Sequence, residues 1–396
     1  MEFNSDSDYF NKRLSKTIRQ KNGIFFTPAS ARNLIYNKLS EFYSNHSIPT
    51  TILEPSFGSG EFLTDVHQRF PSAEIYGVEL NSEMYTRISE QPLFHNAKLT
   101  CGNFLEYHEP TKMDLIIGNP PYFVVKDKNP KCMTGRGNIF VQFIYKCLTE
   151  HLSNNGILAF VLPTSFYNCS YYEPCRKYIK EHTIILHVET IHVKYYETNQ
   201  DTMILIIQNK KAESSHQHPY SYMFSYNNQV YISPYATELQ ELLENTATLK
   251  QLDFQVKTGA VVWNEHKEKL SNEKGTLVIY SNNIVNGELV LMPNNGKEKK
   301  QYIQGFNSSP QKGPAILVSR GYGNKYKFNY MYVDNTIEFY GENHVNVITP
   351  KNENAVAHID RVLASFSNPK MEKFIKKFIG NGAISKTELE TIVPIF

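Results

Sequence analysis

The stretch that decides the fold is residues 114–122, which read DLIIGNPPY. Its apolar part, residues 115–117, predicts the end of a buried strand. Gly118 then interrupts the strand, and the two prolines prevent the turn from continuing as a helix. The stretch therefore holds Asn119 and Tyr122 at the carboxyl edge of a sheet, where open α/β folds bind their ligands.

The turn after this strand offers groups that suit a planar NH2 group. Pro120 and Pro121 have no backbone N–H, so carbonyl groups in the turn are left without partners. The side-chain oxygen of Asn119 and one such carbonyl could together accept both hydrogens of an NH2 group, and the ring of Tyr122 could stack on the ring that carries it. Taken alone, the motif is also compatible with an ordinary strand-to-loop turn.

A glycine-rich turn lies upstream, between a short strand at residues 51–53 and a helix. It reads EPSFGSGEFL (residues 54–63), and Gly58 and Gly60 would let the backbone approach a ligand closely. The turn lacks the third glycine of the dinucleotide motif and the Gly-Lys-Ser/Thr of a phosphate loop, which disfavours a pyrophosphate ligand. Glu54, ahead of the turn, would repel phosphate but attract an ammonium or sulfonium group.

Two more strand ends follow in the chain. The strand predicted at residues 75–80 contains Glu79, about 20 residues after the glycine turn, the spacing at which a carboxylate binds ribose hydroxyls. A third strand begins at Leu99 and is followed by Asn103 and Phe104, which could bind the edge of an adenine and stack on its face. Three ordered strand ends of this kind predict a nucleoside-binding sheet.

The remaining elements flank these strand ends. Thr27 and Pro28 precede a helical pattern at residues 29–42, with Thr27 expected at the N-cap and Pro28 at the first helical position. The N-terminus of such a helix also suits a carboxylate, although a capped helix is the simpler interpretation. Downstream, the periodicity predicts a helix at residues 138–152 and strands at residues 156–162, 184–188 and 202–208.

Composition and cysteine content limit the class of protein. Hydrophobic residues make up 41% of the 396 residues and charged residues 20%, as in soluble globular proteins, and the length suits two domains. No run of about 18 apolar residues is present, so no membrane-spanning helix and no membrane partner are expected. The polar start of the chain lacks the apolar core of a secretion signal. The five cysteines have no CxxC spacing, so we expect a cytoplasmic protein without a metal site or disulfides.

The charge of the chain is unevenly distributed. The net charge is +2, but from residue 246 onward there are 19 Lys and Arg against 14 Asp and Glu, which leaves the remainder net negative. Residues 305–333 mix basic and aromatic side chains without an acidic residue, which suits phosphate contacts and base stacking. We expect Lys325 and Lys327 to contact phosphate and Arg320 to reach a base edge. A solvated, twisted hairpin is the simpler interpretation for any single lysine.

Taken in order, these motifs resemble those of the gamma class of N6-adenine DNA methyltransferases. The resemblance spans nearly the whole chain, and it depends on the order of the motifs more than on any one of them. A segment after residue 257, with KTG followed by VWN, also resembles the start of the recognition region of restriction-modification methylases. The matching motifs are FFTP (25–28), EPSFGSG (54–60), GVEL (77–80), GNFL (102–105) and NPPY (119–122).

The resemblance implies a fold and a domain order. The fold class would be α/β, a Rossmann-like S-adenosylmethionine-dependent methyltransferase sheet followed by a C-terminal mixed α/β target-recognition domain. The catalytic domain would occupy residues 1–213 and a linker region residues 214–245. Residues 246–396 would then recognise the DNA target. The implied partners are double-stranded DNA and a separate cognate restriction endonuclease, with the chain itself a monomer or weak dimer.

The resemblance also implies S-adenosylmethionine as the cofactor. Thr27 and Pro28 would hold its methionine end, Glu79 would bind the ribose hydroxyls, and the family usually carries Asp where Asn103 stands, so that contact keeps an acceptor but loses a charge. The residues expected to bind the cofactor are Thr27, Pro28, Glu54, Gly58, Gly60, Glu79, Leu80, Asn103 and Phe104.

The implied reaction places a flipped adenine at the NPPY turn. Asn119 and the carbonyl of Pro120 would accept the hydrogens of the adenine N6 amino group, whose lone pair could then attack the methyl group. Tyr196, six residues before Thr202, matches the family's second aromatic, which covers the base from the side opposite Tyr122; Tyr195 is the competitor for this role. The residues expected to be catalytic are Asn119, Pro120, Pro121, Tyr122 and Tyr196.

Two other classes of protein remain as alternatives. Glutamine methyltransferases that act on release factors, and some RNA methyltransferases, share the NPPY motif, but the former carry little sequence after the sheet. A DNA-recognition subunit without catalytic activity could retain the cofactor-binding fold, although the intact motif at residues 119–122 argues against it. The sequence does not specify the DNA site, nor whether a nuclease accompanies the protein.

Overall fold

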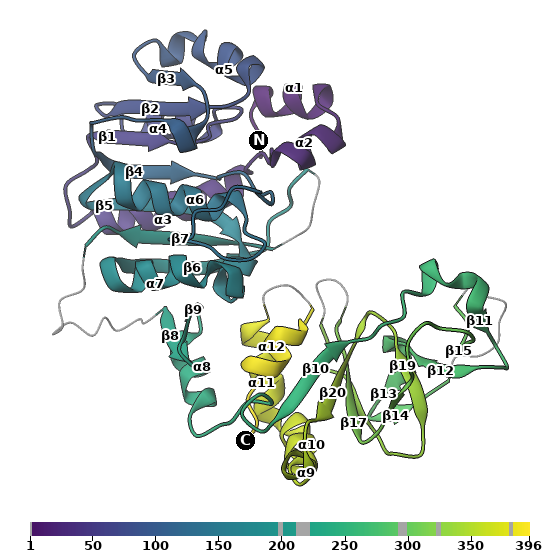
Figure 1. The fold of residues 1–396 in the computed structure, drawn as a ribbon. Coiled ribbons are helices and arrows are strands. Elements are labelled where there is room, and N and C mark those ends of the chain that lie inside the picture. The colour runs from purple at the N-terminus through teal and green to yellow at the C-terminus, as the bar shows by residue number, and fades with distance from the viewer. Residues whose placement is uncertain (1, 197–200, 211–221, 292–298, 322–325, 380–382) are drawn as a thin grey trace. The chain divides into compact units, whose positions relative to one another are not determined.

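The computed structural model describes residues 2–196, 201–210, 222–291, 299–321, 326–379 and 383–396. The chain forms two compact units, which we call unit 1 (Met1–Ser225 with Gln229–Thr237) and unit 2 (Tyr226–Asn228 with Glu238–Phe396). No helix in the described part of the chain is long and apolar enough to cross a membrane. The elements of both units are labelled in Figure 1.

Unit 1 is built on a seven-stranded sheet with the strand order β3-β2-β1-β4-β5-β7-β6, which Figure 1 shows across its width. The pairings are parallel except for those of β7, which runs antiparallel to both β5 and β6. This sheet confirms the predicted Rossmann-like α/β class. Its strands are β1 (Thr51–Glu54), β2 (Glu74–Glu79), β3 (Lys98–Cys101), β4 (Met113–Gly118), β5 (Leu152–Pro163), β6 (Ile184–Ile191) and β7 (Thr202–Gln208).

Helices cover both faces of this sheet because its strands are apolar on both sides. In β4, Leu115 and Ile117 pack into one buried cluster, whereas Ile116 packs into the other. This alternation follows from the two-residue period of a strand. One cluster is completed by α3 (Ala29–Tyr43), α4 (Glu61–Arg69) and α5 (Ser82–Ser89), and the other by α6 (Ile139–Lys146) and α7 (Glu173–His182).

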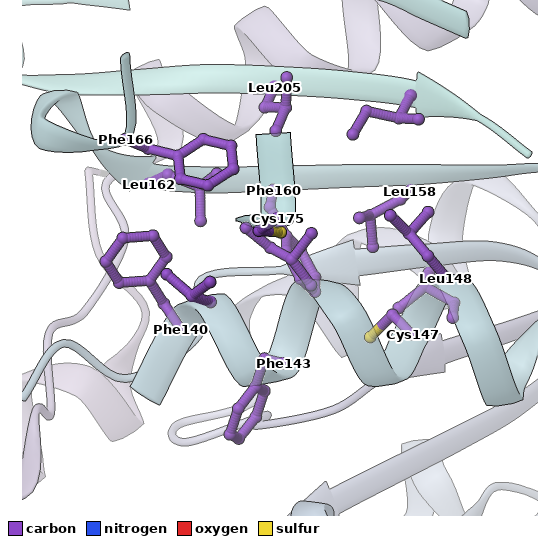
Figure 2. Packing of buried hydrophobic residues seen from close by; sticks show 14 of the residues in the cluster. Phe140, Phe143, Cys147, Leu148, Leu158, Phe160, Leu162, Phe166, Cys175 and Leu205 are labelled. Carbon is purple, nitrogen blue, oxygen red and sulfur yellow. The ribbon is translucent and has the colours of Figure 1, made fainter. Parts of the chain in front are cut away.

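The cluster on the α6 side contains the largest apolar side chains of β5. Figure 2 shows Leu158, Phe160 and Leu162 of this strand packed with Phe140 of α6 and with Leu205 of β7. Phe140 and Phe160 are fully buried, and burying a side chain of this size contributes about 1.5–3 kcal/mol. This packing fixes the positions of β4 and β5 in the sheet, and therefore the position of the turn that follows β4.

The strand order creates a crevice beside the NPPY turn. The chain passes from β1 to β2 and β3 in one direction and resumes at β4 on the other side of β1, so the order reverses between β1 and β4. Ligands bind at such a reversal in open α/β sheets, outside the carboxyl ends of the strands. The two ends are adjacent here, since a Cβ added at Gly118 would lie 3.4 Å from the Cγ of Glu54.

The N-terminal part contains two helices that periodicity did not predict, α1 (Ser5–Arg13) and α2 (Lys16–Asn22), which begin at side-chain caps from Asn4 and Ser15. The predicted cap of α3 is wrong by one position. The helix begins at Ala29, Pro28 occupies the N-cap, and no side chain caps the helix. The hydroxyl of Thr27 is therefore available for another partner.

The other predicted elements of unit 1 are present. The helix predicted at residues 138–152 is α6 followed by a turn of π-helix, η3 (Cys147–His151). The strand predicted at residues 202–208 has the bounds of β7, whereas β5 and β6 are longer than predicted. The chain then forms β8 (Met223–Tyr226), β9 (Gln229–Ile232) and α8 (Ala236–Leu243) within the predicted linker region.

Unit 2 is a mixed α/β unit, as the sequence predicts. It contains a four-stranded sheet (β10-β20-β17-β18), a five-stranded sheet (β11-β15-β12-β19-β16) and a hairpin (β13-β14). The strands are β10 (Phe254–Thr258), β11 (Leu270–Ser271), β12 (Thr276–Ile279), β13 (Ile284–Val285), β14 (Glu288–Leu289), β15 (Tyr302–Ile303), β16 (Gln311–Lys312), β17 (Ala315–Ser319), β18 (Tyr330–Val333), β19 (Glu338–Gly341) and β20 (Val345–Pro350). The helices are α9 (Glu353–Val356), α10 (Ile359–Ser367), α11 (Pro369–Phe378) and α12 (Lys386–Thr391).

Candidate active site

A pocket lies at the carboxyl ends of β1, β2 and β4, at the reversal of strand order. It brings together most of the predicted residues, namely Thr27, Glu54, Gly58, Glu79, Leu80, Asn103, Phe104, Asn119 and Pro121. The other predicted residues of unit 1 do not line it, namely Pro28, Gly60, Pro120, Tyr122 and Tyr196. Five separate segments of the sequence therefore converge on one cavity.

Glu54 is the most unusual charged group in the pocket. Its side chain is 3% exposed, and its Oε2 has no hydrogen-bond partner among the described residues. Burial raises the pKa of Glu54 well above its usual value, and the nearby charges of Glu79 and Glu61 raise it further. A buried carboxylate without a partner is costly to ionise. The site therefore suits a ligand that brings a positive charge.

The two glycines of the turn after β1 have different roles. A Cβ added at Gly58 (φ +52°) would meet no atom within 4 Å, so its open side faces the pocket. Gly60 (φ +72°) does not line the pocket, and its added Cβ would lie 3.2 Å from Ile88 Cγ2. Gly58 therefore leaves room for a ligand, whereas Gly60 permits the left-handed backbone that starts α4.

Glu79 holds the glycine turn against the end of β2. Its carboxylate accepts hydrogen bonds from the backbone N–H groups of Gly58 (2.8 Å) and Asn81 (2.7 Å). Burial still raises the pKa of Glu79, although these hydrogen bonds oppose the shift. Each carboxylate oxygen can accept more than one hydrogen bond, so Glu79 remains able to bind hydroxyl groups in the pocket.

Leu80 and Phe104 line the pocket with opposite exposure. Leu80 is 70% exposed, whereas Phe104 is 2% exposed and packs against Phe143 with ring centroids 4.8 Å apart. Asn103, also in the lining, hydrogen-bonds to its own neighbours in the chain: its Oδ1 accepts from Leu105 N (3.1 Å), and its Nδ2 donates to Glu106 (2.9 Å). An apolar side chain and an aromatic ring in the lining of one pocket can both contact a flat heterocycle.

The amide of Asn119 is held on its nitrogen side. Nδ2 donates to Thr27 Oγ1 at 3.0 Å and to the carbonyl of Phe25 at 3.3 Å. Oδ1 accepts a hydrogen bond from the hydroxyl of Tyr122. A carbonyl oxygen can accept two hydrogen bonds, so Oδ1 retains capacity for one further donor.

Tyr122 is packed on its ring face as well as bonded at its hydroxyl. Its ring stacks on Phe25 (centroids 5.8 Å apart, 27°) and meets the edge of Phe140 (6.0 Å, 84°). The hydroxyl also lies 2.7 Å from the carbonyl of Val161. Burial raises the pKa of Tyr122 well above its usual value, so the hydroxyl remains a donor.

The two candidate tyrosines before β7 have different surroundings. Tyr196 stacks on Phe3 with centroids 3.9 Å apart, and its hydroxyl donates to Asp8. Tyr195 is buried, and its hydroxyl bonds Thr202 Oγ1 at 2.8 Å. Tyr195 also contributes to the raised pKa of Tyr122, after burial. The assignment of Tyr196 to the target base stays a prediction.

Several residues that sequence reasoning missed fasten α1 and α3 to the glycine turn. Ser7 Oγ bonds Ser59 Oγ at 2.7 Å, and the guanidinium of Arg32 bonds Glu61 and Asp65 at 2.7 Å each. The one sequence signal for this segment was Asn4, which is typical of an N-cap and could have predicted the start of α1 but not these contacts. These contacts place the N-terminal segment beside the pocket, which Ser59 and Glu61 line.

The predicted DNA contacts belong to unit 2. Arg320 donates from Nη1 to the carbonyl of Asn343 at 3.0 Å, and its Nε is buried without a partner among the described residues. Lys327 is exposed, and Lys325 lies outside the described residues. In the part of the chain that the structure describes, no group of three or more His, Cys, Asp or Glu could hold a metal ion.

Comparison with known proteins identifies relatives of the whole chain. Residues 79–196 match the Eco57I restriction-modification methylase family. The chain is 31% identical to the type II methyltransferase M.CvrRI of Paramecium bursaria Chlorella virus XZ-6E, over 100% of this chain and 99% of that one. It is 29% identical to the modification methylase CviBIII of Paramecium bursaria Chlorella virus NC1A, over 98% and 97%.

A shorter match covers only part of the chain. The tRNA1(Val) (adenine(37)-N6)-methyltransferase of Pedobacter heparinus is 31% identical over 28% of this chain and 51% of its own. The full-length similarity, together with the sheet and the pocket, decides the family. The chain belongs to the type II DNA methyltransferases of restriction-modification systems, which use S-adenosylmethionine as the methyl donor.

Proposed function

We propose that this DNA methyltransferase methylates the exocyclic N6 amino group of adenine. The observation that carries the proposal is the amide of Asn119, whose Nδ2 is held by Thr27 and Phe25 so that Oδ1 faces away as an acceptor. The name of the tRNA relative, which specifies adenine N6, supports the same atom. The N6 lone pair of adenine is delocalised into the ring, so acceptors for its hydrogens are what the reaction needs.

The NPPY turn would prepare the amino group for transfer. Oδ1 of Asn119 and the carbonyl of Pro120 would accept its two hydrogens, which localises the lone pair on nitrogen. The target would displace or share the hydrogen bond that Tyr122 now donates to Oδ1. The nucleophile in the proposed reaction is the NH2 group of the target, so no side chain of this protein forms a covalent intermediate. The protein would accelerate the reaction by aligning the reacting groups and by electrostatic stabilisation.

The pocket residues fit S-adenosylmethionine, which supplies an electrophilic methyl group on a sulfonium. Glu54 would lie near its positive charge, which would compensate the carboxylate oxygen Oε2 that has no hydrogen-bond partner among the described residues. Gly58 leaves room beside the turn, and Glu79 would accept from the ribose hydroxyls. Leu80 and Phe104 would enclose the adenine of the cofactor. Asn103 would contact the amino group of that adenine in addition to its local partners.

The target base lies inside a duplex and would have to be flipped out to reach Asn119. Tyr122 and Tyr196 would cover its two faces, with Phe25 leaving the face of Tyr122 that it now occupies. In unit 2, Arg320 would read a base edge, and Lys325 and Lys327 would contact phosphate. The partners are double-stranded DNA and a separate endonuclease of the same specificity, and the protein would act in the cytoplasm as a monomer or weak dimer.

The test uses unmethylated bacteriophage λ DNA and methyl-labelled S-adenosylmethionine, followed by mass spectrometry of the digested nucleosides. We expect N6-methyladenosine (deoxy form) as the labelled product, and loss of labelling in Asn119→Ala while calorimetric cofactor binding is retained. Bulk tRNA in a parallel reaction should remain unlabelled. Label in a cytosine product, or in tRNA alone, would contradict the proposal.

A further inference from the structure

Thr27 has a contact that its place before a helix does not predict. A threonine at a helix start usually caps the helix, yet α3 begins at Ala29 and has no side-chain cap. Thr27 is 4% exposed, and its Oγ1 lies 3.0 Å from the Nδ2 of Asn119, which donates to it. The hydroxyl is therefore turned toward the catalytic amide.

The contact with Phe25 favours one orientation of that amide. The carbonyl of Phe25 can only accept, so the atom of Asn119 that faces it must be Nδ2. The two hydrogens of Nδ2 are thus shared between Phe25 O at 3.3 Å and Thr27 Oγ1 at 3.0 Å. Thr27 provides the shorter contact, and Oδ1 is left on the opposite side.

Thr27 is itself anchored from behind. Its carbonyl accepts a hydrogen bond from the guanidinium of Arg32, which is 8% exposed. The same guanidinium is paired with Glu61 and with Asp65 of α4, each at 2.7 Å. A buried pair of this kind is costly to break once formed. A chain of buried polar contacts therefore runs from α4 through Arg32 and Thr27 to Asn119.

We propose that Thr27 is a positioning residue for methyl transfer, whose hydroxyl keeps Oδ1 of Asn119 turned toward the target amino group. The inference rests on the proposed function of Asn119. Without the hydroxyl, the nitrogen side of the amide is held only by the longer contact to Phe25, and once the target displaces Tyr122 from Oδ1 the amide can rotate by half a turn. It then presents an NH2 group to the target, which offers no acceptor for the target's hydrogens.

The resemblance of the sequence assigns Thr27 to the cofactor instead, and the two roles differ in what they change. A cofactor contact sets the affinity for S-adenosylmethionine. A positioning contact sets the rate of transfer when both substrates are bound, because misplacing a catalytic group by about 1 Å can cost about 100-fold. Affinity and single-turnover rate therefore have to be measured on the same variants.

The experiment compares Thr27→Val, which keeps the shape but has no acceptor, with Thr27→Ser, which keeps the hydroxyl. We expect Thr27→Val to lower the single-turnover rate on unmethylated λ DNA by about 10- to 100-fold at saturating S-adenosylmethionine. Its calorimetric Kd for S-adenosylmethionine should change by less than about 3-fold, and Thr27→Ser should retain most of the rate. Thr27→Ala repeats the test if Thr27→Val does not fold, as judged by thermal unfolding.

Wild-type protein and Asn119→Ala separate this inference from the function on which it rests. If wild type makes no N6-methyladenine, or Asn119→Ala transfers normally, the proposed function fails. If both behave as expected but Thr27→Val transfers at the wild-type rate, only the positioning role is overturned. An unchanged rate with a Kd raised more than about 10-fold (about 1.4 kcal/mol) would make Thr27 a cofactor contact.

Discussion

The pocket of unit 1 and the basic stretch of unit 2 (residues 305–333) differ in how their functional side chains are held. In unit 1, Glu79 accepts from two backbone N–H groups and Asn119 has three hydrogen-bond partners within the protein. In unit 2, Lys327 is exposed, and among the described residues the guanidinium of Arg320 donates to one carbonyl, that of Asn343. Groups that stabilise a transition state are more effective when the protein already holds them in place. Groups that bind DNA can instead form their hydrogen bonds and ion pairs with the DNA itself.

Glu54 is the exception within unit 1, and it gives the prediction with the largest expected effect. Its Oε2 has no hydrogen-bond partner in the described part of the chain, so the cofactor's positive charge should supply the missing interaction. Glu54→Gln keeps the shape and removes the charge, and should weaken S-adenosylmethionine binding by about 1.5–3 kcal/mol. In wild type, calorimetric affinity should rise with pH as the raised pKa of Glu54 is passed, because only the ionised carboxylate attracts a cation. The variant should lose this pH dependence.

Thermal unfolding of the cofactor-free protein provides the control for Glu54. The folded-state pKa is raised above the unfolded value, so the stability that protonated Glu54 contributes is present at low pH. It is lost as the pH rises through the folded-state pKa. Glu54→Gln should therefore raise the midpoint of unfolding at pH 8 more than at pH 4. A variant that is less stable at pH 8 would show that Glu54 is a structural residue.

The fold and the edge of the pocket could be predicted from sequence because their signals are local. Apolar runs that end in Gly, Pro or a polar residue place Glu54, Glu79 and Asn119 at strand ends, and parallel strands bring those ends together. The partner of Thr27 could not be predicted, since it lies 92 residues away in the chain. The attachment of α1 through Ser7 to Ser59, 52 residues apart, depends equally on tertiary packing.

The choice between Tyr195 and Tyr196 also lies beyond local pattern, and it gives the second prediction. Neighbouring residues point to opposite sides, but the pattern does not say which side meets the target. Tyr196→Ala should lose about 1–3 kcal/mol of base stacking, which lowers the single-turnover rate by about one to two orders of magnitude. Tyr196→Phe keeps the ring and should retain most of the rate. Tyr195→Phe, which also keeps its ring, serves as the matched control. The assignment is reversed if Tyr195→Ala removes activity while Tyr196→Ala leaves it intact.

Arg320 tests whether unit 2 reads sequence. Arg320→Lys keeps the positive charge but loses the planar fork that can bond two atoms of a base edge. It should relax sequence preference by about 1–3 kcal/mol at one position of the recognition site. Methylation sequencing of λ DNA would measure the preference, and the salt dependence of DNA binding should be unchanged. A variant with wild-type preference would contradict the base-edge assignment and favour a phosphate contact, because a phosphate contact depends on the charge that lysine keeps.

Lys327 should have the smallest effect and the least sequence dependence. Its side chain is exposed, so a phosphate contact would add counterion release without any base readout. Lys327→Ala should weaken binding to all duplexes by a similar factor and reduce the slope of log K against log salt by about 1. Lys351→Ala removes another exposed lysine of unit 2, outside the basic stretch, and should leave the slope unchanged. If the two variants reduce the slope by the same amount, unit 2 attracts DNA through its overall charge, and Lys327 does not contact a specific phosphate. If Lys327→Ala alters the methylated sequence at constant slope, this lysine reads a base, and the two kinds of contact in unit 2 have been assigned the wrong way round.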